Sequence, residues 1–499
     1  MTPCLVECLI LVPNPPKLCT VTVVFDHTFR TTTFACLSAT FSRKRKPRYF
    51  TGRKSPFLST DHFSKSLFTI ALYMLELEQY DISTEFGFLT ELPLERLTNP
   101  YYNPWEKFLD NLNAYILHRT VRKQVNNKLP HLSIDKLANE REMRRAYLVL
   151  SFLGHAYIWS GEPVDRLPAQ ISDPWIAVSK ALGLPPIATY AAVCLWNFKK
   201  IDESGEFTLD NLTTINTFTG SVDESWFYLV LVCFEKEGAF SVKVGLDALN
   251  SAETGNTHLL IENLQQFAES IDMLGSVLMR MEEMCDPHVF YFRIRPFLAG
   301  WKNMASVGLE KGVYYGDETT PRSYAGGSNA QSSLIQFMDI LLGVSHHATG
   351  DLTADSSFLT EMREYMPKKH REFLQDLEPH TFTIRDFVKS QNNEELTLAY
   401  DACLAMLKSF RDKHIQIVTR YVVLQAKKVN KMGSGSTLRS GLAREKKEEK
   451  GTGGTSLLPF LKQCRDETGS AAAGSWGKRI LTDGMLRLKY SKSNGINED

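Results

Sequence analysis

The sequence lacks an apolar run long enough to cross a bilayer, which argues against membrane-spanning helices. The longest candidates, residues 4–12 and 66–75, fall well short of the roughly 18 residues that such a helix needs. The N-terminus also lacks the basic segment of a signal peptide. We therefore expect a cytoplasmic protein with no membrane partner.

An excess charge of one sign and closely paired cysteines are missing as well. Lys+Arg and Asp+Glu number 57 each, so no global field favours a nucleic acid partner. The 9 cysteines are widely scattered and form no CxxC pair, which argues against a disulfide framework or a zinc ribbon. By contrast, 43% of the 499 residues are hydrophobic, enough for a large globular core.

The first 78 residues differ from the rest in composition. Basic residues outnumber acidic ones there, and residues 43–48 read RKRKPR. Such a cluster can be a nuclear localisation signal or an anion-binding patch, but it is more often part of a solvated, disordered segment. We expect residues 1–78 to be disordered and to have no catalytic role. The polar residues 466–499 are expected to form a disordered tail.

Between these ends the chain reads as helices separated by turns, which predicts an all-α fold. Residues 79–183 are expected to form a small helical domain, and Leu184-Pro185-Pro186 begins a larger one over residues 184–465. A polar loop over residues 428–453 is expected to be mobile. The predicted helices include 140–160, 187–198, 226–232, 258–284, 331–342, 395–427 and 456–464.

One histidine stands in the middle of an apolar helical stripe. His414 recurs at spacings of three and four with Leu407, Phe410 and Ile417, so its imidazole points toward the core. Arg411 lies within one turn and can reach the same buried object. A haem would use both, with its iron on the imidazole and a propionate on the guanidinium. The commoner alternative for such a histidine is a hydrogen-bonded core residue.

The other histidines are expected to have no ligand role. His155 lies inside an apolar helix and is interpreted as a hydrogen-bonded core residue. His346 and His347 lie in a polar loop without metal-ligand spacing, which predicts solvated side chains. His370 follows a proline and two lysines, which is typical of a surface or capping position.

Two further stretches can meet anions. Arg293 and Arg295 alternate with aromatic residues, so at least one is expected to pair with an anion in an apolar pocket or to extend to the surface. The glycine-rich turn at residues 326–329 precedes a helix, where it can bind an anion or serve only as a turn.

Six stretches, in order and with near-family spacing, resemble the haem-containing indoleamine 2,3-dioxygenases. The resemblance covers about residues 80–465 and implies an all-α, two-domain fold, with haem b between the domains and held in the larger one. The stretches are LPPIATYAAV (184–193), FYFRIRPFLAGWK (290–302), AGGSNAQSS (325–333), EYMPKKHREFL (364–374), AYDACLAMLKSFRDKHIQIVTRYV (399–422) and KGTGGTSLLPFLK (450–462).

The resemblance implies a set of cofactor residues. By motif position, His414 is the proximal iron ligand, Arg411 resembles the propionate partner, and Asp339 resembles the aspartate that supports the proximal side. His370 matches the family's other well-known histidine, which is not the ligand. The remaining implied cofactor contacts are Gly327 and Ser328.

The resemblance also implies a substrate pocket. Arg295 resembles the arginine that pairs with the substrate carboxylate, a bidentate contact that lysine could not copy. Thr452 resembles the group near the substrate ammonium and a propionate. Leu231 and Asn329 depart from the family pattern, which has a serine and an alanine there; the lost hydroxyl bears on rate and affinity rather than on reaction type. The implied aromatic lining is Tyr190, Phe227, Phe290 and Tyr291.

The implied reaction is the addition of O2 across the indole C2=C3 bond of L-tryptophan, or of a related indoleamine, to give N-formylkynurenine. An electron donor would keep the iron ferrous, and a monomer suffices. One alternative is an O2-binding haem protein without this activity, which would not need Arg295. Another is a signalling adaptor, but its tyrosine motif has Leu209 here. A haem-free helical scaffold is the third.

Overall fold

The chain divides into two compact units. A computed structural model describes residues 5–12, 17–24, 76–347, 358–429, 451–452 and 456–483. The units are Met1–His62 and Phe63–Asp499. In the first, β1 (Leu5–Val12) pairs antiparallel with β2 (Lys17–Val24). The prediction of a disordered leader did not include this hairpin, and the basic cluster at 43–48 lies outside the described residues.

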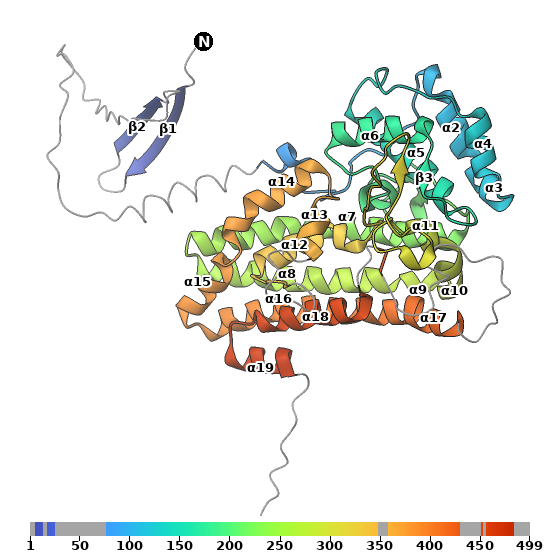
Figure 1. Ribbon diagram of the computed structural model, residues 1–499. Coiled ribbons are helices and arrows are strands. Elements are labelled where there is room, and N and C mark those ends of the chain that lie inside the picture. Colours follow the sequence, from blue (N-terminus) through green and yellow to red (C-terminus); the bar gives the residue numbers. More distant parts are fainter. Residues whose placement is uncertain are drawn as a thin grey trace, which may run out of the picture. The chain divides into compact units, whose positions relative to one another are not determined.

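Three long helices form the body of the second unit. Helix α8 (Thr257–Met279) packs along both α7 (Val222–Glu253) and α16 (Glu394–Val418), as Figure 1 shows. A side-chain oxygen at the N-cap of each accepts a backbone N–H three residues on, which fixes where the helix begins. The apolar residues of α8 that recur at spacings of three and four are buried: Leu260, Leu264, Phe267, Ile271, Leu274 and Leu278.

Shorter helices precede and cover this body. Helix α5 (Glu140–Trp159) is buried at every residue from Arg144 to Trp159, so it forms the centre of the N-terminal helical region. Around it lie α2 (Asn103–Asp110), α3 (Leu112–Leu117), α4 (Val121–Lys128) and α6 (Ala169–Leu182). Later elements are α11 (Arg295–Leu298), α12 (Ser333–Leu341), α13 (Phe358–Arg363), α14 (Lys368–Leu377), α15 (Thr383–Gln391), α17 (Leu424–Val429), α18 (Leu457–Ser470) and α19 (Ser475–Asp483).

The strands of the second unit are short. β3 (Arg166–Leu167) pairs parallel with β6 (Tyr314–Tyr315), and β4 (Phe198–Lys200) pairs antiparallel with β5 (Leu212–Thr214). They tie loops together and form no extended sheet, so the predicted all-α class is confirmed. Among the helices of the described residues, none is both long and apolar enough to cross a membrane.

Two predicted elements differ from the structure. The helix expected over residues 187–198 is only a π-helical turn, η3 (Ala191–Leu195). The Asn197 amide ends it, because this side chain bonds the backbone N–H and carbonyl of Asn216 and starts the β4–β5 pairing. The tail predicted as disordered from residue 466 is helical as far as Asp483. It is held by Asp401, whose carboxylate accepts the N–H groups of Ala473 and Gly474.

Candidate active site

Two adjoining cavities meet around His414. They hold about 700 Å³ and 980 Å³ of empty space, part of it open to solvent. The second spans the distance from α8 and α16 to the turn before α12 and to α18. Both are mainly apolar, which is the usual character of a cofactor or small-molecule site. The residues that line both are Leu278, Asn329, Ala330, His414, Phe460 and Leu461.

The imidazole of His414 is available as a ligand. Helix α16 directs it into both cavities, and it makes no hydrogen bond to any residue that the structure describes. Burial, reinforced by the Arg411 cation, lowers the pKa of His414 to about 4. The ring is therefore neutral at physiological pH, the state in which histidine binds a metal.

Arg411 and Asp339 form a buried ion pair beside His414. One guanidinium nitrogen of Arg411 lies 2.5 Å and 2.8 Å from the two Asp339 carboxylate oxygens. Burial alone would raise the pKa of Asp339, but Arg411 and His346 outweigh it and hold that pKa below its usual value. Arg411 lines the first cavity, and its Nε has no partner among the described residues. Asp339 lies behind it and does not line either cavity.

His346 is not solvated, so this prediction was wrong. Its side chain is 7% exposed and lies between two carboxylates, 3.2 Å from Asp339 and 2.6 Å from Glu467. Burial lowers the pKa of His346, but Asp339 and Glu467 overcome this effect and raise it to about 11. Glu467 lies on α18, but the helix predicted there ended at residue 464. No carboxylate partner was therefore expected for His346. His347 is 57% exposed, as predicted.

The second cavity is lined by four of the six predicted substrate residues. Arg295, on α11, is 4% exposed and lines this cavity with Phe227, Phe290 and Thr452. The rings of Phe227 and Phe290 lie 4.8 Å apart between centroids. Tyr291 does not line the cavity; its ring lies 5.4 Å from the Arg295 guanidinium carbon and packs behind it.

The segment that contains Thr452 is docked on the glycine-rich turn. The Thr452 hydroxyl donates to the Gly327 carbonyl at 2.7 Å. The backbone carbonyl of Thr452 accepts hydrogen bonds from the N–H groups of Gly300 and Gly326. Gly326 and Gly300 approach so closely that a Cβ on either would collide with the other's backbone, so the turn requires glycine there. Gly327 and Ser328 line the second cavity, and their role as cofactor contacts stays a prediction.

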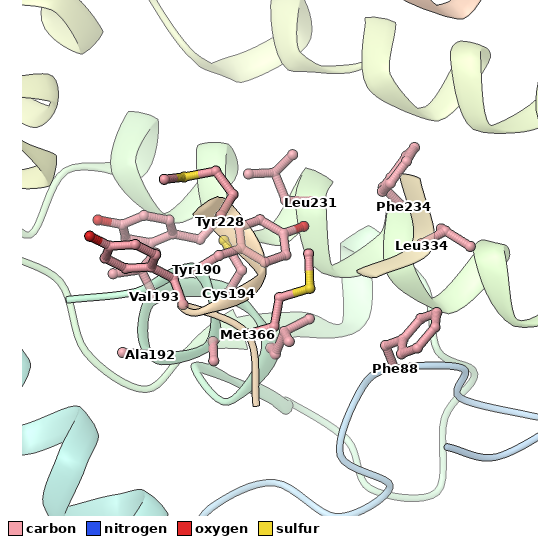
Figure 2. Close-up of a cluster of buried hydrophobic side chains, with 14 of the residues drawn as sticks. Phe88, Tyr190, Ala192, Val193, Cys194, Tyr228, Leu231, Phe234, Leu334 and Met366 are labelled. Atoms are coloured by element: carbon pink, nitrogen blue, oxygen red, sulfur yellow. The ribbon is translucent and has the colours of Figure 1, made fainter. Parts of the chain in front are cut away.

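The sequence analysis missed a buried carboxyl group at the first cavity. Glu235 accepts hydrogen bonds from the hydroxyls of Tyr190 (3.0 Å) and Ser332 (2.6 Å), both of which line this cavity. Burial raises its pKa to about 7. Figure 2 shows Tyr190 in one buried cluster with Leu231 and other side chains of α7. The available signal was the first of three consecutive charged residues after the apolar run WFYLVLVCF.

The two remaining histidine predictions have opposite outcomes. His155 Nδ1 donates to the Phe297 carbonyl and its Nε2 accepts the Ala188 N–H, so the satisfied core histidine is confirmed. His370 is 1% exposed, so its predicted surface position was wrong. It packs against the ring of Phe88, 5.1 Å between centroids, from a segment that the sequence did not mark as a neighbour.

The residues around the cavities fit a haem. A neutral imidazole supplies the nitrogen that iron takes in many haem proteins, and the surrounding wall is apolar and aromatic. The buried, unpartnered Nε of Arg411 is a donor that an anionic propionate can use.

Comparison with known proteins decides the family. The family model described as Indoleamine 2,3-dioxygenase matches residues 76–471. The chain belongs to the indoleamine 2,3-dioxygenase family. The match to this family spans both cavities, from Tyr190 through Cys464, and confirms the resemblance drawn from the six motifs.

Three members of the indoleamine 2,3-dioxygenase family show how far the similarity extends. Indoleamine 2,3-dioxygenase of Saccharomyces cerevisiae is 47% identical over 428 residues, which are 79% of this chain and 93% of the relative. Human indoleamine 2,3-dioxygenase 2 is 36% identical over 400 residues, 79% and 95% of the two chains. A Fusarium equiseti relative named 6-hydroxytryptophan 2,3-dioxygenase is 37% identical over 402 residues, which are 79% of this chain and 97% of the relative.

Proposed function

We propose that this chain is a haem-dependent dioxygenase that adds both atoms of O2 across the C2=C3 bond of L-tryptophan or a related indoleamine. The product would be N-formylkynurenine, the first in the kynurenine pathway. The observation that carries the proposal is that a neutral His414 and a buried Arg295 line the same apolar cavity in a member of this family. Cytoplasmic localisation and a monomeric state stay predictions.

The first role of the chain is to hold the cofactor. His414 would ligate the iron of haem b, and Arg411 would pair with a propionate while Asp339 keeps the guanidinium in place. Bound haem would supply the O2-binding iron and the oxygen chemistry, and an external electron donor would keep that iron ferrous. Gly327 and Ser328 line the second cavity, which His414 also lines.

The second role is to orient the amino acid substrate. Arg295 would bind its carboxylate, and Phe227 and Phe290 would lie against the indole ring. Thr452 would close the cavity from the glycine-rich turn, near the substrate ammonium. No carboxylate is among the described residues that line this cavity, in keeping with a reaction that needs no general base. An O2 carrier would have no use for the Arg295 contact.

The relative named 6-hydroxytryptophan 2,3-dioxygenase carries a substrate name with a hydroxyl group on the indole ring, so the named substrates of these relatives differ. Leu231 and Asn329, the two departures from the family pattern, both line the first cavity. We infer that they affect rate and substrate choice, since neither replaces the proposed ligand or the carboxylate partner.

The test compares two neighbouring arginines. Purified haem-loaded protein is given L-tryptophan, O2, ascorbate and a redox mediator, and formylkynurenine is measured. Arg295→Ala should raise KM for tryptophan about 10- to 100-fold, the cost of losing a charge-assisted hydrogen bond, with haem content unchanged. Arg293→Ala is the matched control, because Arg293 is exposed and lies outside both cavities. No product from the wild type, or equal effects of the two changes, would contradict the proposal.

A further inference from the structure

A second group of potential metal ligands lies beside the first cavity, which one of its members, Cys464, lines. His346, Cys464 and Glu467 each offer one ligand atom, and these atoms lie within 4.8 Å of one another. His346 comes from the loop after α12, whereas the other two residues are three apart on α18 and so share one face of that helix. More than a hundred residues of sequence separate the two parts.

The burial of this group is unusual for surface polar residues. The side chains of His346 and Glu467 are 7% and 16% exposed, and Cys464 is buried. His346 Nδ1 lies 2.6 Å from a Glu467 oxygen, so the imidazole and the carboxylate are hydrogen-bonded to each other. Ligand atoms on a tetrahedral zinc lie roughly 3.5 Å apart, as bond lengths of 2.0–2.3 Å require. His346 Nδ1 and the Glu467 oxygen, now 2.6 Å apart, would therefore move apart by about 1 Å to admit the metal, and all three ligand atoms already lie within 4.8 Å of one another.

The other ring nitrogen of His346 is oriented as in many metal sites. His346 Nε2 lies 3.2 Å from an Asp339 oxygen, which can accept its N–H. A carboxylate behind the ligating histidine fixes the ring orientation, and a metal on Nδ1 would displace the proton that this nitrogen now shares with Glu467. Asp339 is itself held by Arg411, so this orientation does not depend on the metal.

The charges also match a divalent cation. A thiolate and the Glu467 carboxylate would neutralise it, while Asp339 keeps its pairing with Arg411. His347 offers a fourth ligand at the solvent edge, because its Nδ1 lies 3.2 Å from Glu467. Sulfur, imidazole and carboxylate together suit zinc and its neighbours rather than calcium or magnesium.

We propose that His346, Cys464 and Glu467 bind a divalent cation of the zinc class, with His347 or water as the fourth ligand. The metal would clamp α18 onto the loop after α12. Since α18 also supplies Phe460 and Leu461 to the cavity wall, occupancy would fix that wall. The proposal adds a second site to the proposed dioxygenase, and metal binding can be measured without enzyme turnover.

The experiment uses the full-length, haem-loaded protein, so that His414 is already occupied. The protein is treated with chelator, dialysed against graded zinc chloride and analysed for zinc by mass spectrometry. We expect about one zinc per chain and an affinity about tenfold weaker or worse in Cys464→Ser, which removes a direct ligand. Cys403→Ser is the matched control, since Cys403 is also a buried free thiol, on α16.

A second variant and a direct readout keep the proposal falsifiable. Glu467→Gln preserves shape and should weaken zinc binding as well. Zinc X-ray absorption should show one sulfur neighbour in the wild type and none in Cys464→Ser. The proposal is overturned if the wild type retains no zinc, or if wild type and Cys464→Ser retain it equally; His346 then serves only as a protonated bridge between Asp339 and Glu467.

Discussion

At the scale of single residues, Glu235 makes the stability of the protein depend on pH. Burial raises its pKa from 4.5 to about 7. Between these values the folded state binds more protons at Glu235 than the unfolded state, so this residue's contribution to stability is fully present below pH 4.5 and is lost as pH rises through 7. At about 1.4 kcal/mol per pKa unit, the wild type should lose roughly 3 kcal/mol of unfolding free energy as Glu235 ionises. Glu235→Gln cannot ionise and should not show this loss.

The measurement is the urea midpoint of both proteins from pH 5 to 8. The amide of glutamine can still accept from Tyr190 and Ser332, so the local contacts are kept. The wild type should weaken relative to Glu235→Gln as pH rises. Parallel curves would show that Glu235 does not titrate in this range.

The same scale shows what the sequence could and could not predict about the site. Helical spacing was enough to bring Arg411 and His414 to one cavity, because the two residues lie on one helix. It could not bring Glu467 to His346, because that contact joins residues 121 positions apart. Glu235 was missed for a related reason: its partners Tyr190 and Ser332 come from two other segments.

At the scale of elements, close helix packing depends on a glycine. A Cβ on Gly154 of α5 would lie 2.2 Å from the ring of Trp175 on α6. Trp175 is fully buried and cannot move aside, so Gly154→Ala should destabilise the protein by about 1–3 kcal/mol despite its better helix propensity.

Gly275→Ala is the matched control on α8. Its Cβ would meet only the end of Lys413, a long side chain that can shift, so the urea midpoint should stay the same or rise. No loss in Gly154→Ala, or a loss equal to that in Gly275→Ala, would contradict the assigned effect of the Trp175 contact.

Most elements could be predicted because apolar periodicity and N-caps are local signals. The predicted start and end of the α5 and α8 helices lie within a few residues of those observed. The helix predicted at η3 was too long, because the end of this turn depends on Asn197, whose partner Asn216 comes from another segment. The helices beyond residue 466 were missed because the contact of Asp401 with Ala473 is equally non-local.

At the scale of the whole molecule, haem binding by the unit that contains both cavities should not require residues 1–75. The family match begins at residue 76, and the compact second unit begins at Phe63. A chain that starts at residue 76 should keep its haem and its activity within about twofold, because every residue lining the two cavities is retained. A chain that ends at residue 455 should lose haem, since it lacks the cavity residues of α18. Haem loss from the first truncation would contradict this prediction.

The most direct test of the proposed function is the visible absorption spectrum of the purified wild type beside His414→Ala. If His414 is the iron ligand, the wild type shows a haem Soret band that the variant loses, while circular dichroism shows that its helices remain. A wild type that stays colourless when supplied with haem, or a variant with an unchanged Soret band, would contradict the assignment of His414 and the function built on it.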